Sequence, residues 1–331
     1  MSKITAAITA VGAYVPDYVL TNQILETMVD TNDEWITSRT GIKERRILKE
    51  EGKGTSFLAI NAAQDLINKR RINPKDIELV IVATATPDMK AASTAAFTAT
   101  QIGAVNAFSF DLEAACSSFL FGMSTAAKYI ESGRYKNVLL IGADKNSSFI
   151  NYEDRATCII FGDGAGAVLF EPNNEDLGLQ DEYLRSDGSG REFLQATYGG
   201  SLYPMTKESL EKGQQYVFQD GRTVFKNAVS NMADVVLKIL ERNNLTKEDI
   251  TWLTAHQANK RIVDATANRI NIEKDKVMMN IEKYGNTTSA TLPLLLHDYE
   301  SQLKKGDNII FATFGGGFTW GSIYLKWAYN S

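Results

Sequence analysis

The sequence is poor in the residues that build disulfides and metal sites. Its 331 residues include only two cysteines, Cys116 and Cys158, and two histidines, His256 and His297. Two cysteines cannot form a multi-disulfide scaffold, and neither a C-x-x-C motif nor clustered histidines point to structural zinc. We therefore expect no metal, and any thiol or imidazole chemistry must use one of these four residues.

Long hydrophobic runs and an N-terminal targeting signal are also missing. The longest aliphatic runs, LVIVA (79–83) and VLLIG (138–142), are far shorter than the ~20 residues of a membrane span. The first residues lack the basic-then-apolar pattern of a signal peptide. The net charge of −5 gives no general attraction to nucleic acid or to a membrane surface. We therefore expect a cytoplasmic protein that binds neither.

What is present is the composition of a large globular protein. Hydrophobic residues make up 44% and charged residues 23% of a chain more than twice the length of a typical ~150-residue domain. Short β-branched runs read as buried strands over 77–83, 138–142 and 309–314. Between such runs lie helix-length stretches, of which Ala228–Leu240 has an apolar face made by Val229, Met232, Ala233, Val236, Leu237 and Leu240. The alternation predicts an α/β protein with largely parallel strands.

An internal repeat divides the chain. INPKDIELVIVA (72–83) resembles LTKEDITWLTAH (245–256), and KNVLLIG (136–142) resembles DNIIFAT (307–313), with offsets of 173 and 171 residues. Each second strand is followed by a Gly-rich stretch interpreted as a hairpin, at 161–170 and 314–327. We therefore predict two similar halves, 1–172 and 173–331, although chance similarity between α/β strand entries is the alternative. The polar, Gly-rich stretch at about 173–222 is expected to be a loop-rich substrate-binding insertion.

Cys116 lies where a strand turns into a helix. Phe108 and Phe110 alternate as in a strand, and Ser117–Ile130 is a stretch of small and apolar residues typical of a helix. A thiol at a helix N-terminus is expected to have a lowered pKa and to lie near free backbone N–H groups that can bind an oxyanion. The competing interpretation is that Cys116 is a small buried core residue.

The other cysteine and one histidine are expected to be structural. Cys158 lies in a β-branched run, ATCIIF, and is interpreted as a core strand residue. The GDGAGA that follows leads into another apolar strand rather than a helix, so it predicts a tight hairpin and not a phosphate-binding loop. His297, beside Asp298 in a helical stretch, is interpreted as a surface or packing residue.

Two further residues lie at places where catalytic side chains collect. His256 directly follows the strand TWLTA, and the ends of strands in an α/β sheet often carry active-site groups. Asn286 lies in YGNTTSA, another turn that leads into a helix, and adding the repeat offset to Cys116 gives position 287. The duplication therefore predicts that Cys116 and Asn286 face one another, although GNTTS is also an ordinary helix cap.

Six motifs together resemble one enzyme family. They are DEWITSRTGIKERR (33–46), DLEAACSSF (111–119), DRATCIIFGDGAGAVLF (154–170), HQANKRI (256–262), YGNTTSA (284–290) and FGGGFTWGS (314–322). They are similar, in the same order, to β-ketoacyl-acyl carrier protein synthase III, the condensing enzyme that starts type II fatty acid synthesis. The resemblance covers about residues 4–327. It implies the thiolase-like fold, a duplicated βα unit in five layers (αβαβα), and a homodimer.

The resemblance also implies a reaction and its residues. The catalytic set is Cys116, His256 and Asn286, with an oxyanion hole made by the N–H groups of Cys116 and Gly316. Cys116 takes an acyl group from acyl-CoA, and His256 and Asn286 assist the decarboxylation of malonyl-acyl carrier protein (malonyl-ACP). No cofactor is implied beyond the CoA of the substrate.

Binding residues follow from the same resemblance. The family's CoA contacts fall on Trp35, Arg39, Arg155, Gly221 and Asn259, and its carrier-protein contacts fall on or near Lys226, Arg261 and Arg269. Ala91 and Ala92 stand where the family commonly has an aromatic residue and a proline that close the acyl pocket. We therefore expect branched or longer primers to be accepted.

Several other functions remain as alternatives. They are a related condensing enzyme of specialised metabolism, a non-condensing acyl-CoA-binding homologue, and a cysteine hydrolase. A biosynthetic thiolase is disfavoured because the C-terminal FGGGFTWGS lacks a second cysteine. A hydroxymethylglutaryl-CoA synthase is disfavoured because the expected Glu general acid/base is not found in RTGIKERR.

Overall fold

Two β-sheets form the frame of the protein in a computed structural model that describes residues 4–330. Each sheet mixes parallel and antiparallel pairs. The first has the strand order β1 (Thr5–Tyr14), β7 (Gly164–Asn173), β6 (Val138–Asp144), β4 (Leu79–Ala83), β5 (Phe108–Leu112). The second has the order β11 (Trp252–Ala255), β12 (Asn308–Gly315), β13 (Thr319–Lys326), β8 (Gly178–Ser186).

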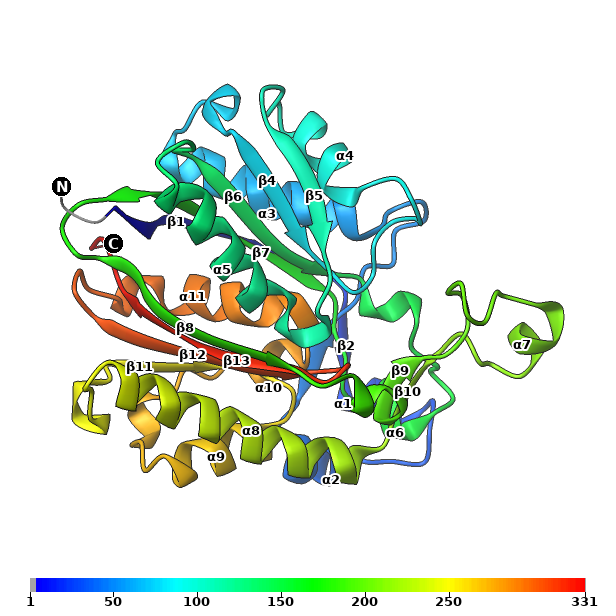
Figure 1. Cartoon of the computed structure of the whole chain (residues 1–331). Helices are drawn as coiled ribbons and strands as arrows, with labels where there is room; N and C mark the ends of the chain where they lie inside the picture. Colours follow the sequence, from blue (N-terminus) through cyan, green and yellow to red (C-terminus); the bar gives the residue numbers. More distant parts are fainter. Residues whose placement is uncertain (1–3, 331) are drawn as a thin grey trace.

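Helices cover both sheets and also fill the space between them, which gives five layers (Figure 1). Apolar side chains of α3 (Thr55–Arg70) and α4 (Thr94–Gln101) pack on the outer face of the first sheet. Helices α5 (Ser118–Glu131) and α11 (Thr291–Tyr299) lie in the central core that joins the two sheets. Helices α8 (Gly221–Arg242) and α9 (Lys260–Arg269) cover the outer face of the second sheet. The expected five-layered α/β fold is confirmed.

Shorter elements gather where the two sheets end, beside a projecting arm that carries α7 (Figure 1). Several of them enclose a small core of their own, in which Leu25, Ile36, Cys158 and Val217 are buried. They are β2 (Val19–Thr21), α1 (Asn22–Glu26), α2 (Asp33–Thr40), β3 (Glu44–Arg46), α6 (Arg155–Cys158), β9 (Leu194–Ala196), α7 (Lys207–Glu211), β10 (Val217–Gln219) and α10 (Ile281–Tyr284).

The strand registers define how the two halves correspond. In the first sheet Leu79 of β4 pairs with Val138 of β6, and in the second Trp252 of β11 pairs with Ile309 of β12. The repeat offsets of 173 and 171 residues therefore hold at the level of strand pairing. Strand β1 corresponds to β8, because each lies antiparallel to the last strand of its half, β7 or β13.

Local sequence explains why the buried elements form. Strand β4 is an LVIVA run with every residue buried, as a strand covered on both faces requires. Helix α5 is rich in small residues because it lies between two sheets, and a Cβ on its Gly122 would come within 2.6 Å of a Leu140 methyl carbon. Helix α8 begins where the Asp220 carboxylate accepts a hydrogen bond from the Thr223 N–H.

Several local expectations differ from the structure. The ATCIIF run contains α6 rather than a strand, although Cys158 is fully buried as expected. The stretch 161–170 is not a hairpin, because β7 pairs with β1 and β6 and not with the residues just before it. Leu237 is 44% exposed, so it lies off the apolar face of α8. Strands β1, β7, β8 and β13 pair antiparallel, so the expectation of largely parallel sheets was wrong.

The stretch expected to be a loop-rich insertion also contains regular structure. Residues 178–186 form β8, an edge strand of the second sheet, and only the following segment up to α8 carries short elements and turns. Polarity misled the interpretation here, because β8 packs at a sheet edge where alternate side chains face water.

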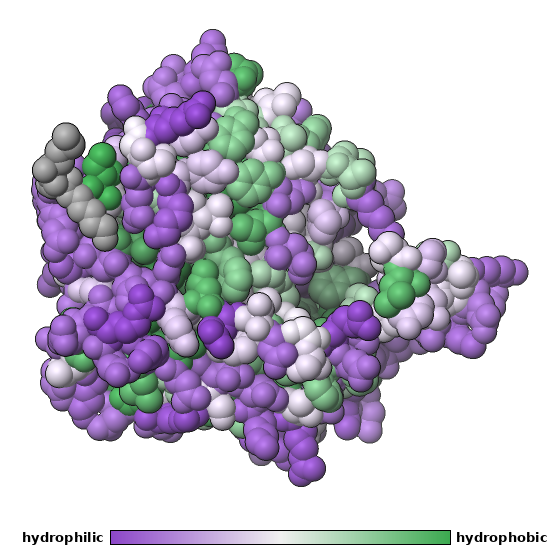
Figure 2. Space-filling view, in the orientation of Figure 1, coloured by the Kyte–Doolittle hydropathy of each residue, from purple (hydrophilic) through white to green (hydrophobic). Residues whose placement is uncertain are grey.

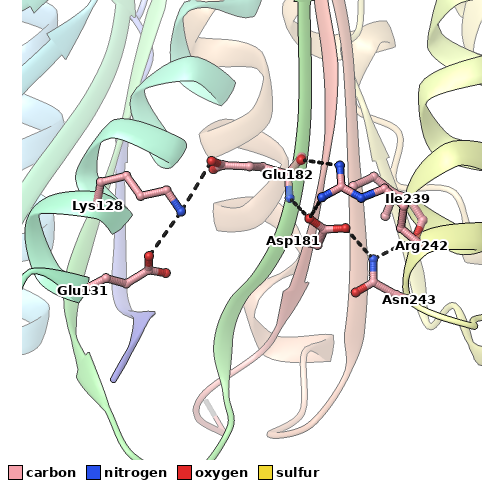
Figure 3. A network of polar contacts seen from close by, with 7 residues as sticks. All are labelled: Lys128, Glu131, Asp181, Glu182, Ile239, Arg242 and Asn243. Atoms are coloured by element: carbon pink, nitrogen blue, oxygen red, sulfur yellow. Dashed lines mark hydrogen bonds and ion pairs between the residues drawn. The ribbon is translucent and has the colours of Figure 1, made fainter. Parts of the chain in front are cut away.

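A polar network ties the two halves together on the side shown in Figure 3. Lys128 of α5 lies 3.2 Å from Glu131 and 3.4 Å from Glu182 of β8. Next to it, the Asp181 carboxylate accepts hydrogen bonds from Arg242 and Asn243 at the end of α8, each at 2.8 Å. The network joins α5 of the first half to β8 and α8 of the second.

Candidate active site

One cavity of about 810 Å³ collects the residues that the sequence singled out. Cys116, His256, Asn286 and Gly316 all line it, although they come from four separate segments of both halves. In the view of Figure 2, hydrophilic residues cover most of the surface and apolar residues gather toward its middle. The cavity wall is correspondingly apolar in part, with Phe149, Phe161, Leu194, Val217, Val224 and Phe314 among its residues.

Cys116 lies in a tight turn, η2 (Ala115–Ser117), between β5 and α5. The turn needs a left-handed residue at Ala115, whose φ is 49°, and it leaves Cys116 only 8% exposed. Burial raises the pKa of the Cys116 thiol to about 12, and the charges of Asp144 and Glu113 add to the rise, while the backbone N–H opposes it. The expected lowering of this pKa was therefore wrong, because desolvation outweighs the helix N-terminus.

His256 follows β11 and is 1% exposed. Its backbone N–H donates to the Ala312 carbonyl of β12 at 2.9 Å, which fixes the residue at the end of the sheet. Neither imidazole nitrogen has a hydrogen-bond partner within residues 4–330. Burial lowers the pKa of His256 to about 3, so the ring is neutral at physiological pH. A neutral, unpartnered imidazole in a cavity can donate a hydrogen bond to a bound substrate.

Asn286 is held by its backbone and by one side-chain bond. Its N–H donates to the Ile160 carbonyl at 2.9 Å, and its own carbonyl accepts from the Gly162 N–H at 3.0 Å. Its Oδ1 accepts from the Thr288 N–H at 2.9 Å, in the turn η7 (Thr288–Ala290). With Oδ1 occupied, the Nδ2 group is the end of the amide that can donate into the cavity.

Glycines at the end of β12 bring the backbone close to the cysteine. A Cβ on Gly315 would lie 2.7 Å from the Cys116 nitrogen, so only glycine fits without displacing η2. Gly316 comes next and lines the cavity. The sequence analysis named Gly316 but not Gly315, whose role depends on a contact between segments some 200 residues apart.

Comparisons with known proteins agree with this geometry. Two family models match the chain, 3-oxoacyl-[acyl-carrier-protein (ACP)] synthase III over residues 110–188 and its C-terminal region over residues 240–327. A beta-ketoacyl-[acyl-carrier-protein] synthase III of Bacteroides thetaiotaomicron is 56% identical over 100% of this chain and 98% of its own. The chain belongs to the 3-oxoacyl-[acyl-carrier-protein] synthase III family.

Other relatives extend the likeness to sequence and structure. A family member from Porphyromonas gingivalis is 52% identical over 100% of this chain and 98% of its own. The crystal structure of 3-oxoacyl-[acyl-carrier-protein] synthase III from Aquifex aeolicus matches with a TM-score of 0.90 and 40% identity, covering 97% of this chain and 100% of that one. The thiolase-like fold is confirmed, and by its family the chain is a condensing enzyme of the acyltransferase class.

The residues expected to bind CoA form two groups. The Arg155 guanidinium lies 4.9 Å from the centre of the Trp35 ring and donates to the Asp30 carbonyl, and Arg39 is exposed at the end of α2. None of these three lines the cavity. Gly221 and Asn259, at the starts of α8 and α9, do line it. The first group thus belongs to the surface outside the cavity and the second to its wall.

The three basic residues expected to meet the carrier protein differ in their surroundings. Lys226 on α8 is exposed, and the Arg261 guanidinium lies 5.3 Å from the centre of the Phe225 ring, which lines the cavity. Arg269 is already engaged, because it donates to the Asp234 carboxylate at 2.6 Å and to the Ser230 carbonyl.

Ala91 and Ala92 do not line the main cavity. They line a second cavity of about 380 Å³, which shares Pro87, Met89, Lys90 and Glu113 with the first. Ala91 has a φ of 72°, so the turn presents its backbone in the left-handed region. The space expected from two small side chains is present, but next to the cysteine cavity rather than inside it.

The sequence analysis missed most of the apolar wall. Leu194 and Val217 belong to β9 and β10, which are only three residues long and lie in the Gly-rich stretch before α8. Elements this short leave no period to detect in a sequence.

Two searches of the described chain found nothing. Within residues 4–330, no cluster of three or more His, Cys, Asp or Glu side chains is placed to hold a metal ion. Among the helices of the same residues, none combines the length and apolar character needed to cross a membrane.

Proposed function

We propose that the chain condenses an acyl-CoA primer with malonyl-ACP to give 3-oxoacyl-ACP, carbon dioxide and free CoA, and so initiates fatty acid synthesis. Cys116 carries the acyl group, and His256 and Asn286 serve the decarboxylation. The observation that supports this most strongly is the unpartnered, neutral His256 beside Cys116 and Asn286 in one cavity. No cofactor enters the proposed reaction besides the CoA of the primer.

In the first half-reaction the Cys116 sulfur attacks the thioester carbonyl of the primer. The tetrahedral oxyanion is held by the N–H groups of Cys116 and Gly316, the new thioester forms on Cys116, and CoA leaves with the thiol proton. Because burial keeps the thiol protonated, with a pKa of about 12, the nucleophile is generated only as the substrate binds. This protects the buried thiol from other electrophiles between turnovers.

In the second half-reaction malonyl-ACP enters the same cavity. Loss of carbon dioxide leaves an enolate whose oxygen is the former thioester carbonyl, and His256 Nε2 and Asn286 Nδ2 donate hydrogen bonds to it. The enolate carbon attacks the acyl-Cys116 carbonyl, and the cysteine thiolate departs. Neutral donors suit this step, since the imidazole with a pKa of about 3 adds no buried charge of its own.

The substrates reach the site from outside the cavity. Trp35 and Arg155 would hold the adenine of CoA, Arg39 its phosphates, and Gly221 and Asn259 the pantetheine arm that enters beside α8 and α9. The acidic carrier protein would dock on Lys226 and Arg261. Arg269 contributes less, because Asp234 already neutralises it.

We further propose a homodimer that acts in the cytoplasm. Strand β5 is an edge strand, and apolar residues near it are exposed, with Phe97 at 52%, Val105 at 66% and Phe108 at 41%. Such an exposed apolar edge favours pairing with a second copy. The cavity beside Ala91 and Ala92 includes Ser109 and Phe110 of this strand, so a partner would lie close to the acyl group.

The experiment that tests the division of roles measures each half-reaction in a His256→Ala variant. Mass spectrometry of the Cys116 peptide after addition of acetyl-CoA reports acylation, and carbon dioxide release from malonyl-ACP reports decarboxylation. We expect acylation within a few-fold of the wild type and a loss of decarboxylation of about 100-fold or more. Equal loss of both half-reactions would refute the assignment.

A further inference from the structure

Asp144, the last residue of β6, is a buried carboxylate that the proposed reaction does not use. It is 0% exposed, and every hydrogen bond to it comes from a donor on another segment. Its Oδ1 accepts from the Thr84 hydroxyl at 3.0 Å, the Ala85 N–H at 2.8 Å, and the N–H and hydroxyl of Thr86 at 3.1 and 3.0 Å. Its Oδ2 accepts from the Ser289 N–H at 2.8 Å, in the turn η7 of the other half.

Ser289 is the counterpart of Cys116 in the duplicated unit. Turn η2 has a left-handed residue at Ala115, with φ 49°, and η7 has one at Thr288, with φ 51°. These residues are 173 apart, and each turn runs directly into a central helix, α5 or α11. The residue that follows the left-handed position is Cys116 in one half and Ser289 in the other. The repeat offset used with the sequence gave 287, two residues short of this counterpart.

Asp144 in turn corresponds to Gly315. Val138 and Ile309 occupy equivalent places beside β4 and β11, so the last residue of β6 matches the last residue of β12. At Gly315 no side chain is present, and a Cβ would lie 2.7 Å from the Cys116 nitrogen. The N–H of Cys116 is therefore left open, whereas the equivalent N–H of Ser289 is taken by the Asp144 carboxylate.

We propose that Asp144 is a positioning residue whose carboxylate permanently fills the second half's counterpart of the oxyanion hole, and that it thereby fixes Asn286 for decarboxylation. This inference rests on the proposed function. The link is short: Asp144 holds the Ser289 N–H, the neighbouring Thr288 N–H donates to Asn286 Oδ1, and the Asn286 Nδ2 is left facing its substrate. One half of the duplication stabilises an oxyanion of the substrate, and the other holds a resident one.

The same carboxylate acts on the cysteine through its charge. Three of its donors are backbone N–H groups, which bind an ionised carboxylate best. Its charge and that of Glu113 raise the pKa of Cys116, and the third ionisable group of the cavity near them, His256, is neutral. Removal of the charge should therefore increase the thiolate fraction at a given pH.

The decisive variant is Asp144→Asn, which keeps the shape but can accept on one side only. The Ser289 N–H or the Thr84–Thr86 donors then lose their acceptor, so η7 shifts and Asn286 is misplaced. We expect carbon dioxide release from malonyl-ACP to fall about 10- to 100-fold. In the same protein, iodoacetamide should alkylate Cys116 about tenfold faster at pH 8, as a pKa lower by about one unit implies.

A matched control is Asp163→Asn. Asp163 is also fully buried in the first half, but its carboxylate accepts from Leu48 and Ser147 and makes no bond to η7. We expect this variant to melt at a lower temperature while the alkylation rate of Cys116 stays unchanged. A second variant, Ser289→Ala, keeps the N–H that Asp144 binds and should decarboxylate like the wild type.

Opposite changes in the two rates distinguish positioning from a general loss of structure. The proposal is overturned if Asp144→Asn slows alkylation and decarboxylation together, if it changes neither, or if Ser289→Ala matches its defect. Should Asp144→Asn fail to fold, the wild-type alkylation profile still decides the charge effect: its rate should keep rising beyond about pH 10, and a plateau below about pH 9 contradicts it. Failure of the proposed function is seen separately, as a wild type that is not acylated at Cys116 by acyl-CoA.

Discussion

Substitution of Gly315 by alanine tests the oxyanion hole at its tightest point. The added Cβ would lie 2.7 Å from the nitrogen of Cys116 and 3.2 Å from its Cα and Cβ, whereas ordinary contacts begin at 3.4 Å. The end of β12 and the turn η2 must therefore separate by about 0.7 Å at their closest atoms. The new methyl group also stands against the N–H that should bind the oxyanion.

The expected loss follows from the value of one oxyanion donor. Removal of such a donor costs about 10²- to 10³-fold in rate, or about 3–4 kcal/mol of transition-state stabilisation. We expect Gly315→Ala to be acylated by acetyl-CoA about 100- to 1000-fold more slowly than the wild type. Rapid-quench mass spectrometry of the Cys116 peptide measures this rate, and carbon dioxide release from malonyl-ACP should change much less.

Gly321→Ala is the control for overpacking alone. Gly321 lies on β13 of the same hairpin, and a Cβ there would come 2.6 Å from a methyl carbon of Leu184, away from Cys116. Both variants should lose about 1–3 kcal/mol of folding stability. Wild-type acylation in Gly315→Ala, or an equal loss of acylation in Gly321→Ala, would show that the Cys116 N–H does not serve as proposed.

Three further predictions concern pH, stability and primer choice. Because burial lowers the pKa of His256 to about 3, the unfolded chain takes up a proton below pH 6.5 that the folded chain refuses, so stability should fall by about 1.4 kcal/mol per pH unit between pH 6.5 and 3. Urea unfolding of the wild type and His256→Ala over this range should differ by that slope, and parallel curves would contradict it. Arg242→Ala removes the contact with Asp181 and should lower the free energy of unfolding by about 0.5–1 kcal/mol, less in high salt, whereas Lys238→Ala, which loses only a surface pair with Glu241, should cost less than about 0.5 kcal/mol. With Ala91 and Ala92 beside the acyl site, isobutyryl-CoA and longer acyl-CoA primers should support condensation alongside acetyl-CoA, and strict acetyl preference would refute this.

The parts of the fold that could be predicted are those with a strong local pattern. Strands β4, β6 and β12 are uniformly apolar β-branched runs, and their ends were predicted to within two residues. The repeat predicted that the turns around Cys116 and Asn286 come from equivalent places, and the cavity brings both together. Patterns of this kind depend on burial within one element, which a single sequence records directly.

The parts that could not be predicted depend on contacts between distant segments. The run around Cys158 has strand-like residues, yet Asp154 caps a short helix there and the core that buries it comes from α1, α2 and β10. The pKa of Cys116 rises because the cavity is closed and Asp144 lies near it, which no local pattern shows. Gly315 and Asp144 gain their meaning only from the turn that each faces.

A single-turnover measurement on the isolated acyl-enzyme tests the central claim most directly. Wild-type protein is acylated with acetyl-CoA, freed of CoA, and mixed with malonyl-ACP. We predict that the acetyl group leaves Cys116 at the same rate as one equivalent each of carbon dioxide and 3-oxoacyl-ACP appears, and that Cys116→Ala forms no 3-oxoacyl-ACP. Release of the acetyl group as free acetate, or an acetyl group found on a residue other than Cys116, would contradict the account.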